Sequence, residues 1–220
     1  TKLSENLFKG LAPWMQRLPG GLIHVNVVGC ALFAAISGSS AATVATVGKM
    51  SIPELRKRKY PEKILLGSLA GSGTLGLLIP PSIILIIYGV TVQESIAKLF
   101  IAGIIPGIMI ALIFMSYVVV WSLINKKSMP KSSENSSFLE KVKKSKQLMP
   151  VILLILAVIG SIYTGVATAT EAASLGVVGA LILSYFQKSL TMETFKSSLL
   201  GATKTSCMIA FILAGATFLS

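Results

Sequence analysis

Charged residues are scarce in this chain. They make up 13% of its 220 residues, about half of the roughly 25% that is usual in soluble globular domains. Hydrophobic residues make up 53% of the chain. This composition excludes an ordinary soluble domain. It predicts an integral membrane protein in which long apolar segments cross the bilayer as helices, so that the fold is all-α.

Cysteine and histidine are also rare, with two cysteines and one histidine in the chain. Cys30 and Cys207 lie in apolar runs and match no zinc, redox or disulfide spacing. The chain has neither a Ser/His/Asp, Cys/His or paired-carboxylate set for catalysis nor a Walker A motif for ATP. We therefore expect no enzymatic activity, no ATP hydrolysis and no cofactor.

Basic residues outnumber acidic ones by 20 to 8, which gives a net charge of +12. They lie between apolar blocks, as the positive-inside rule predicts for cytoplasmic loops, so a nucleic-acid partner is not expected. The strongly basic segments 49–63 and 126–147 are predicted to be cytoplasmic. The nearly uncharged segment 91–98 is predicted to lie on the opposite, periplasmic side.

Apolar blocks and basic connections together divide the chain into segments. The expected order is a cytoplasmic-side amphipathic connecting segment (1–20), a re-entrant hairpin (21–48), a basic cytoplasmic loop (49–63), a discontinuous transmembrane helix (64–90), a periplasmic loop with a transmembrane helix (91–125), a cytoplasmic linker rich in Lys and Ser (126–147), and further transmembrane helices (148–220). Two spans are expected within 148–187, because that apolar block is too long for one.

The first apolar block, 21–48, has basic residues on both sides. Two full crossings would need roughly 40 residues, more than the block contains. A hairpin that enters the membrane and leaves on the same side satisfies both constraints, with its tip at Ser37–Ser40. The alternative is a single tilted helix that violates the charge rule.

The second apolar block cannot form one continuous helix. It contains a glycine-rich stretch from Gly67 to Gly76 and then Pro80 and Pro81. Because proline lacks an N–H and restricts the residue before it, we expect two half-helices joined by an unwound stretch at about 73–81. A broken helix beside a re-entrant hairpin is typical of secondary transporters.

Hydroxyl side chains gather at both predicted breaks, namely Ser37, Ser39, Ser40, Ser72 and Thr74. Together with freed backbone carbonyls they are able to hold a hard cation such as Na⁺. The alternative role is ordinary hydrogen bonding between helices. Neither block carries Asp, Glu or Arg at its break, so Na⁺ coupling is favoured over a proton relay.

Three motifs in this order resemble the large membrane subunit of tripartite ATP-independent periplasmic (TRAP) transporters. They lie at Phe33–Ala42, Gly71–Ser82 and Gly165–Ala173. The third departs from the family pattern, which usually has Pro at the position of Ala169. Since the family subunit is about twice as long, the chain is expected to be its middle part, with a second hairpin and a second sodium site after Ser220.

The resemblance implies an inverted-repeat, elevator-type transporter in the bacterial inner membrane, surrounded by lipid. It implies Na⁺-driven uptake of an organic acid such as a C4-dicarboxylate or sialic acid. A periplasmic substrate-binding protein would deliver the acid. A small four-helix membrane subunit, separate or fused, would brace the scaffold.

The resemblance also implies which residues bind. The expected Na⁺ ligands are two hydroxyls and three backbone oxygens, from Ser37, Ser39, Gly76, Ile79 and Pro81. The residues expected to face the substrate are Ser40, Ser72 and Thr74. We also expect that Gly76 is required because only glycine readily adopts an unusual backbone conformation there.

Three alternatives remain open at this point. A divalent-anion/Na⁺ symporter of similar architecture would transport without the binding protein. A non-transporting membrane scaffold would show no sodium dependence and would tolerate substitution of Ser37 and Ser39. An ion channel would show flux too fast for alternating access.

Overall fold

The computed structural model describes residues 2–130 and 145–219, and these form helices and connections with no strand among them. The chain divides into two compact units, Thr1–Gly176 and Val177–Ser220, which are described separately. The elements are α1 (Lys2–Met15), α2 (Ile23–Ser37), α3 (Ser40–Lys57), α4 (Glu62–Gly73), η1 (Thr74–Leu77), α5 (Ile83–Val92), α6 (Ile96–Ile124), η2 (Lys126–Ser128), η3 (Lys146–Leu148), α8 (Met149–Tyr163), α9 (Ala169–Phe186) and α10 (Met192–Leu219). Most of the predicted linker 126–147 lies outside the described residues.

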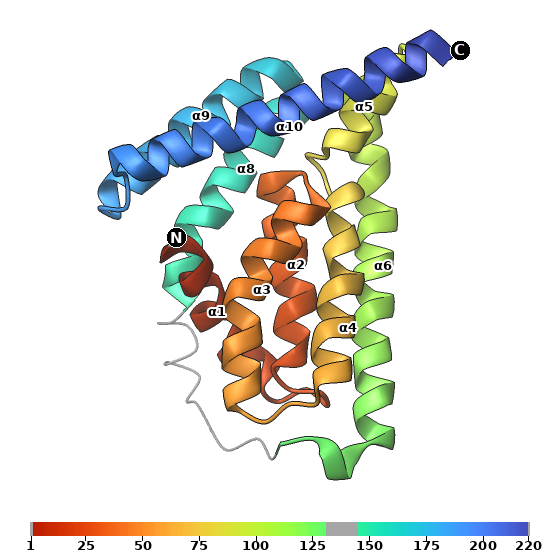
Figure 1. Ribbon diagram of the computed structural model, residues 1–220, viewed down its shortest axis with the longest axis vertical. Coiled ribbons are helices and arrows are strands. Elements are labelled where there is room, and N and C mark those ends of the chain that lie inside the picture. Colours follow the sequence, from red (N-terminus) through yellow and green to blue (C-terminus); the bar gives the residue numbers. More distant parts are fainter. Residues whose placement is uncertain (1, 131–144, 220) are drawn as a thin grey trace. The chain divides into compact units, whose positions relative to one another are not determined.

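In the first unit, α2, α3 and α4 lie side by side, with α6 alongside α4 (Figure 1). Their shared core contains side chains from each of these helices and includes Ile23, Leu55, Leu65 and Val118, all at most 1% exposed. The α2–α3 hairpin and the broken α4–α5 segment are therefore packed against one another and do not stand apart.

The predicted connecting segment 1–20 is helical over most of its length, as α1. Leu11 and Ala12 are buried in the same core as Leu148, just before α8. This burial fixes α1 against the hairpin, and the turn that follows it leads directly into α2.

The basic segment 49–63, predicted to be a loop, is largely helical. α3 continues to Lys57, α4 begins at Glu62, and only residues 58–61 are non-helical. Lys, Arg and Glu are good helix formers, and the Glu54–Arg58 pair, four residues apart with Oε1 and Nε at 2.8 Å, supports the last turn. The basic residues mark the end of the hairpin that is far from its tip, but α3 continues through them and does not end where they begin.

Among the described residues, three helical segments are long and apolar enough to cross a membrane: α6, α9 and Met192–Gly215 of α10. α2 and α5 are apolar but have only 15 and 10 residues. α8, predicted as a full span, also has 15 residues, about 22 Å of helix, which is less than the roughly 30 Å of a bilayer core.

α9 begins at a capping box. The Glu171 carboxylate accepts hydrogen bonds from the Thr168 backbone N–H and hydroxyl, both at 2.8 Å, and the Glu171 N–H donates back to Thr168 Oγ1 at 3.3 Å. Residue 169 is Ala, whereas the family that the sequence resembles usually has Pro at this position. In this chain the capping box marks the start of the helix.

The second unit contains the end of α9, a short turn and α10. At the start of α10, the Thr194 N–H donates to Thr191 Oγ1 at 3.2 Å and the Thr191 N–H to Thr194 Oγ1 at 2.9 Å. Large apolar side chains of α10 are exposed, with Phe211 at 83% and Phe218 at 90%. Such a surface suits contact with lipid or with other membrane helices.

Candidate functional site

The helix that contains the two adjacent prolines is broken as the sequence predicts. α4 ends at Gly73, a 3₁₀ turn follows to Leu77, and α5 begins only at Ile83. In a continuous helix, the N–H groups of residues 80 and 81 would bond to the carbonyls of Gly76 and Leu77, but prolines have none. The Ser82 hydroxyl donates to the Leu77 oxygen at 2.7 Å instead, and no hydrogen bond to the Gly76 oxygen is found within the described residues.

The hairpin tip is a two-residue turn between α2 and α3. Gly38 has a φ of 59° and ends α2, with its N–H bonded to the Ala34 oxygen at 2.9 Å. Ser39 begins α3 as its N-cap, since its hydroxyl accepts from the Ala42 N–H at 3.4 Å. The tip therefore brings polar backbone and hydroxyl side chains together at the place where the two arms meet.

A small hydrogen-bond network holds the tip together. Ser37 Oγ lies 3.0 Å from Thr43 Oγ1, and Thr43 Oγ1 donates to the Ser39 oxygen at 2.7 Å. Ser37 Oγ also lies 3.3 Å from the Ser39 oxygen. Thr43 is fully buried and was not singled out from the sequence, although it follows Ser39 by one helical turn.

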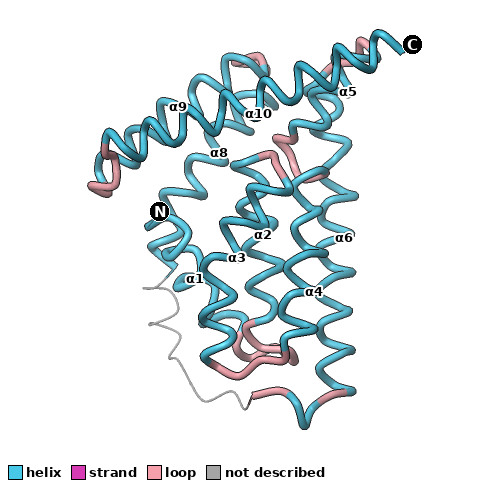
Figure 2. The backbone as a smooth tube through the Cα atoms, in the orientation of Figure 1, coloured by secondary structure: helices cyan, strands magenta, loops and turns pink. Residues whose placement is uncertain are grey.

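The tip and the break are in direct backbone contact (Figure 2). The Ile83 N–H, the first of α5, donates to the Gly38 oxygen at 3.1 Å. A Cβ at Gly76 would lie 2.8 Å from the Ser40 nitrogen and 3.0 Å from the Ser39 oxygen. A Cβ at Gly38 would lie 2.7 Å from the Pro81 oxygen. Two stretches about 40 residues apart in sequence thus form one site, in which glycines allow the close approach.

The structural reason to expect glycine at position 76 differs from the predicted one. Gly76 is absent from the residues with positive φ, which include Gly38. The space at Gly76 is instead filled by the backbone of Ser39 and Ser40. The expected requirement for glycine therefore arises from the contact between the hairpin tip and the helix break, and not from the local backbone conformation at Gly76.

The break is supported from the other side by α6. A Cβ at Gly103 would lie 2.8 Å from the Leu78 oxygen, and one at Gly107 would lie 3.0 Å from Ile79 Cγ1. These glycines are four residues apart, a spacing that allows close helix packing in membranes. This pair was not predicted from the sequence, although its four-residue spacing is a signal for close helix packing.

Of the five predicted Na⁺ ligands, Gly76 and Pro81 lie against the hairpin tip, whereas Ile79 lies against Gly107 of α6. Ser37 and Ser39 belong to the tip, and Gly76, Ile79 and Pro81 belong to the break. Their donors are neutral oxygens, and within the described residues no group of three or more His, Cys, Asp or Glu side chains is placed to hold a metal. Neutral hydroxyl and carbonyl oxygens suit a hard monovalent cation better than a transition metal.

The residues predicted to face the substrate are placed differently from one another. Ser40 begins α3 beside Gly76. Thr74 is exposed, and its hydroxyl donates to the Gly71 oxygen at 2.7 Å. Ser72 is fully buried and donates to the Ser68 oxygen at 2.6 Å, so the structure places it in the contact between α4 and α2.

Asn26 connects the hairpin to α4 and was also missed. It is fully buried, and its side-chain amide donates to Ser68 Oγ at 2.9 Å and to the Leu65 oxygen at 3.2 Å. The Ser72 hydroxyl lies 3.4 Å from the Asn26 backbone oxygen. These bonds join the first arm of the hairpin to the broken helix well below the tip.

Asn26→Ala should lower the stability of the full-length protein by about 0.6 to 1.7 kcal/mol, the range for hydrogen bonds between membrane helices. Thermal unfolding of the detergent-solubilised protein would measure the effect. Asn125→Ala is the matched control, because the Asn125 amide bonds only within its own helix, to the Trp121 oxygen at 2.9 Å. Equal unfolding midpoints for the two variants would contradict the bridging role of Asn26.

Comparison with known proteins identifies relatives of the whole chain. A sequence model of the tripartite ATP-independent periplasmic transporter, DctM component, matches residues 1–220. The chain is 37% identical over 198 residues to the C4-dicarboxylate TRAP transporter large permease protein DctM of Pseudomonas aeruginosa, covering 90% of this chain and 46% of that protein. It is 34% identical over 218 residues to the sialic acid TRAP transporter large permease protein SiaM of Vibrio cholerae, covering 98% and 50%.

A third relative is the isethionate TRAP transporter permease protein DctMQ of Oleidesulfovibrio alaskensis. The identity is 35% over 217 residues, which cover 98% of this chain and 34% of that protein. The chain thus spans about half the length, or less, of the curated relatives it matches.

Proposed function

The chain belongs to the DctM component family of tripartite ATP-independent periplasmic transporters, and from this premise we propose that the full-length protein is a Na⁺-coupled importer of an organic acid in the bacterial inner membrane. The observation that carries the proposal is the contact of the hairpin tip with the helix break, where the Ile83 N–H donates to the Gly38 oxygen at 3.1 Å. Membrane-embedded breaks of this kind bind substrates and coupling ions in secondary transporters.

Na⁺ is the coupling ion that the donor set favours. The hydroxyls of Ser37 and Ser39 and the carbonyls of Gly76, Ile79 and Pro81 would replace its water shell. A proton-coupled carrier would need titratable groups at the same depth, and the tip and the break contain none. Because the ligands come from both the tip and the break, bound Na⁺ would hold the two together.

The same contact gives a route to coupling. With Na⁺ bound, the tip would be fixed against the break, and the acid would bind beside Ser40 and Thr74. The hairpin and the broken helix are joined at two levels, at the tip and at Asn26. We propose that they move as one body against the scaffold, as an elevator mechanism requires.

The names of the relatives support the proposed substrate class. Their names refer to C4-dicarboxylate, sialic acid, isethionate and ectoine, and we propose an organic acid of this range, with a C4-dicarboxylate and sialic acid as the first candidates. The tip and the break carry no Arg or Lys. We propose that a cationic partner for the acid lies in the part of the protein outside this chain, or that helix ends and hydroxyls alone bind the acid here.

The proposed partners are a periplasmic substrate-binding protein and a small four-helix membrane subunit, separate or fused. The test is reconstitution of the full-length protein with both partners in liposomes, followed by uptake of labelled C4-dicarboxylate and sialic acid. We expect uptake only when an inward Na⁺ gradient and the binding protein are both present.

The other outcomes separate the alternatives. Uptake that needs Na⁺ but no binding protein would show a binding-protein-independent symporter. Absence of sodium-dependent uptake of any organic acid of this range, with the protein folded and inserted, would favour a non-transporting scaffold. Either result would overturn the proposal in its present form.

Neutralising the basic end of the hairpin should leave substrate choice unchanged. Residues 56–59 hold four consecutive basic residues, and they lie at the end of the hairpin opposite the tip. Replacing all four with Gln should reduce correct membrane orientation without changing the ratio of uptake between two competing acids. Cysteine accessibility would measure orientation, and a changed ratio would contradict the assignment of the site to the tip.

A further inference from the structure

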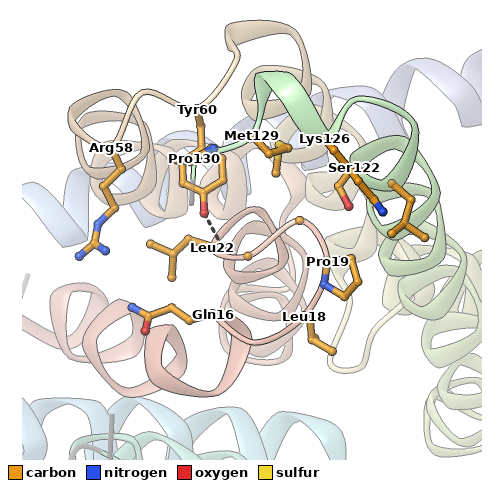
Figure 3. Close-up of a pocket in the computed structure, with 13 residues that line it drawn as sticks. Gln16, Leu18, Pro19, Leu22, Arg58, Tyr60, Ser122, Lys126, Met129 and Pro130 are labelled. Carbon is orange, nitrogen blue, oxygen red and sulfur yellow. Dashed lines mark hydrogen bonds between the residues drawn. The ribbon is translucent and has the colours of Figure 1, made fainter. Parts of the chain in front are cut away.

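A hollow of about 460 Å³ lies at the end of the first unit that is opposite the hairpin tip. Three connections meet there: the turn between α1 and α2, the loop between α3 and α4, and the end of α6 with the residues after it (Figure 3). The residues that line it belong to none of the sites described above. This end of the bundle carries the basic segments that the sequence predicts to be cytoplasmic.

The charge of the lining is positive. Arg58 and Lys126 line the hollow, and among the described residues no acidic side chain does. Figure 3 draws Arg58 with Tyr60 on the α3–α4 side, and Lys126 with Ser122 on the α6 side. Arg58 Nε bonds to Glu54 at 2.8 Å, which leaves the other N–H groups of the guanidinium able to donate. The lining therefore favours an anion.

Tyr60 adds a neutral donor. Its hydroxyl accepts from the Leu22 N–H at 3.1 Å, so its own proton remains able to donate to a ligand oxygen. Burial raises the pKa of the Tyr60 hydroxyl, and the group therefore stays protonated near neutral pH. A neutral donor beside two cations is well suited to a phosphate oxygen.

Apolar side chains complete the walls and distinguish the ligand from a simple soluble anion. Leu18 and Leu123, which are 37% and 47% exposed, line the hollow together with Met129. A free inorganic anion would gain nothing from these contacts, whereas a lipid has an anionic head and an apolar body. Leu123 lies on α6, one of the helices long and apolar enough to cross a membrane, so this wall would be within reach of a lipid in the bilayer.

We propose that this hollow binds the head group of an anionic phospholipid, with Arg58 and the Tyr60 hydroxyl on one wall, Lys126 on the other, and the apolar part of the lipid against Leu18 and Leu123. Basic pockets between helix ends on the cytoplasmic side bind such head groups. The lipid would join the hairpin end of the bundle to α6.

The test is native mass spectrometry of the full-length protein with phosphatidylglycerol and with phosphatidylcholine of the same acyl chains. The double variant Arg58→Gln/Lys126→Gln should bind phosphatidylglycerol about tenfold to thirtyfold more weakly, since each cation near a lipid surface contributes about 1 kcal/mol. Arg56→Gln/Lys127→Gln is the matched control. It also removes one Lys and one ion-paired Arg, because Arg56 bonds to Glu62 at 2.6 Å, but neither residue lines the hollow.

The charge-retaining variant Lys126→Arg should bind as the native protein does, which separates loss of the site from loss of the fold. Three results would overturn the proposal. One is an equal loss in the pocket pair and the control pair, which would indicate diffuse surface attraction. Another is displacement of the lipid by millimolar inorganic phosphate, which would indicate a soluble-anion site. The third is equal binding of the two lipids by the native protein.

Discussion

Gly76→Ala should reduce sodium-driven uptake at least about tenfold, and Gly76→Val should abolish it. The added Cβ would lie 2.8 Å from the Ser40 nitrogen and 2.9 Å from the Ser39 carbonyl carbon, and these are backbone atoms that cannot turn aside as a side chain does. Overpacking of this kind costs about 1 to 3 kcal/mol. The hairpin tip would have to move away from the break, and the oxygens from the two sides would no longer converge. Uptake into liposomes, normalised to the amount of inserted protein, measures the effect.

Gly67→Ala is the matched control for this experiment. Gly67 lies in the same broken helix, and a Cβ there would meet nothing within 4 Å. Its replacement by Ala should leave uptake within about twofold of the native level, since Ala favours a helix by about 1 kcal/mol over Gly. Full activity of Gly76→Val, or equal losses for the two positions, would contradict the contact between the tip and the break.

Removing hydroxyls from the tip should weaken sodium dependence more than it weakens the fold. We expect Ser37→Ala and Ser39→Gly each to raise the Na⁺ concentration for half-maximal uptake about tenfold, since a hydrogen bond or ligand to a charged group contributes about 1.5 to 3 kcal/mol. Gly is chosen at position 39 because Ser39 is the N-cap of α3, and Gly in place of Ser at an N-cap costs only a few tenths of a kcal/mol.

The control for the tip variants is Ser161→Ala. The Ser161 hydroxyl donates to the Val158 oxygen at 2.8 Å within α8, so this change removes a hydroxyl bond of the same kind far from the tip in sequence. Its sodium dependence should equal that of the native protein. Unchanged half-saturation in both tip variants would exclude their hydroxyls as ligands, while an equal shift in Ser161→Ala would assign the effect to general destabilisation.

The local breaks in the fold could be predicted because their causes are local. Two consecutive prolines remove two helix donors wherever they lie, and the structure breaks the helix between Gly73 and Ile83. A Gly favours the end of one helix and a following Ser favours the start of the next. In the structure Gly38 ends α2 and Ser39 begins α3. Charge counted along the chain predicted a hairpin over 21–48, but its second arm, α3, continues through the basic residues to Lys57.

What could not be predicted is which surfaces meet. Ser72 and Thr74 are two residues apart, and the helix turns one into the packed interface and the other outward. Both were predicted to face the substrate, because the presence of a hydroxyl residue in the sequence does not show which way its side chain points. The spacing of Gly103 and Gly107 marks a helix face suited to close packing, but it does not say which segment packs there. The link from Asn26 to Ser68 likewise depends on three-dimensional packing.

The most direct test of the account is equilibrium binding of radioactive sodium to the full-length protein in detergent, without substrate or partners. The account predicts saturable sodium binding by the native protein and by Gly67→Ala, and at least about tenfold weaker binding at the tip site in Ser39→Gly and in Gly76→Val. Because the part of the protein outside this chain could add a further sodium site, the comparison between variants is decisive. Identical binding curves for all four proteins would show that the hairpin tip and the helix break do not form a sodium site.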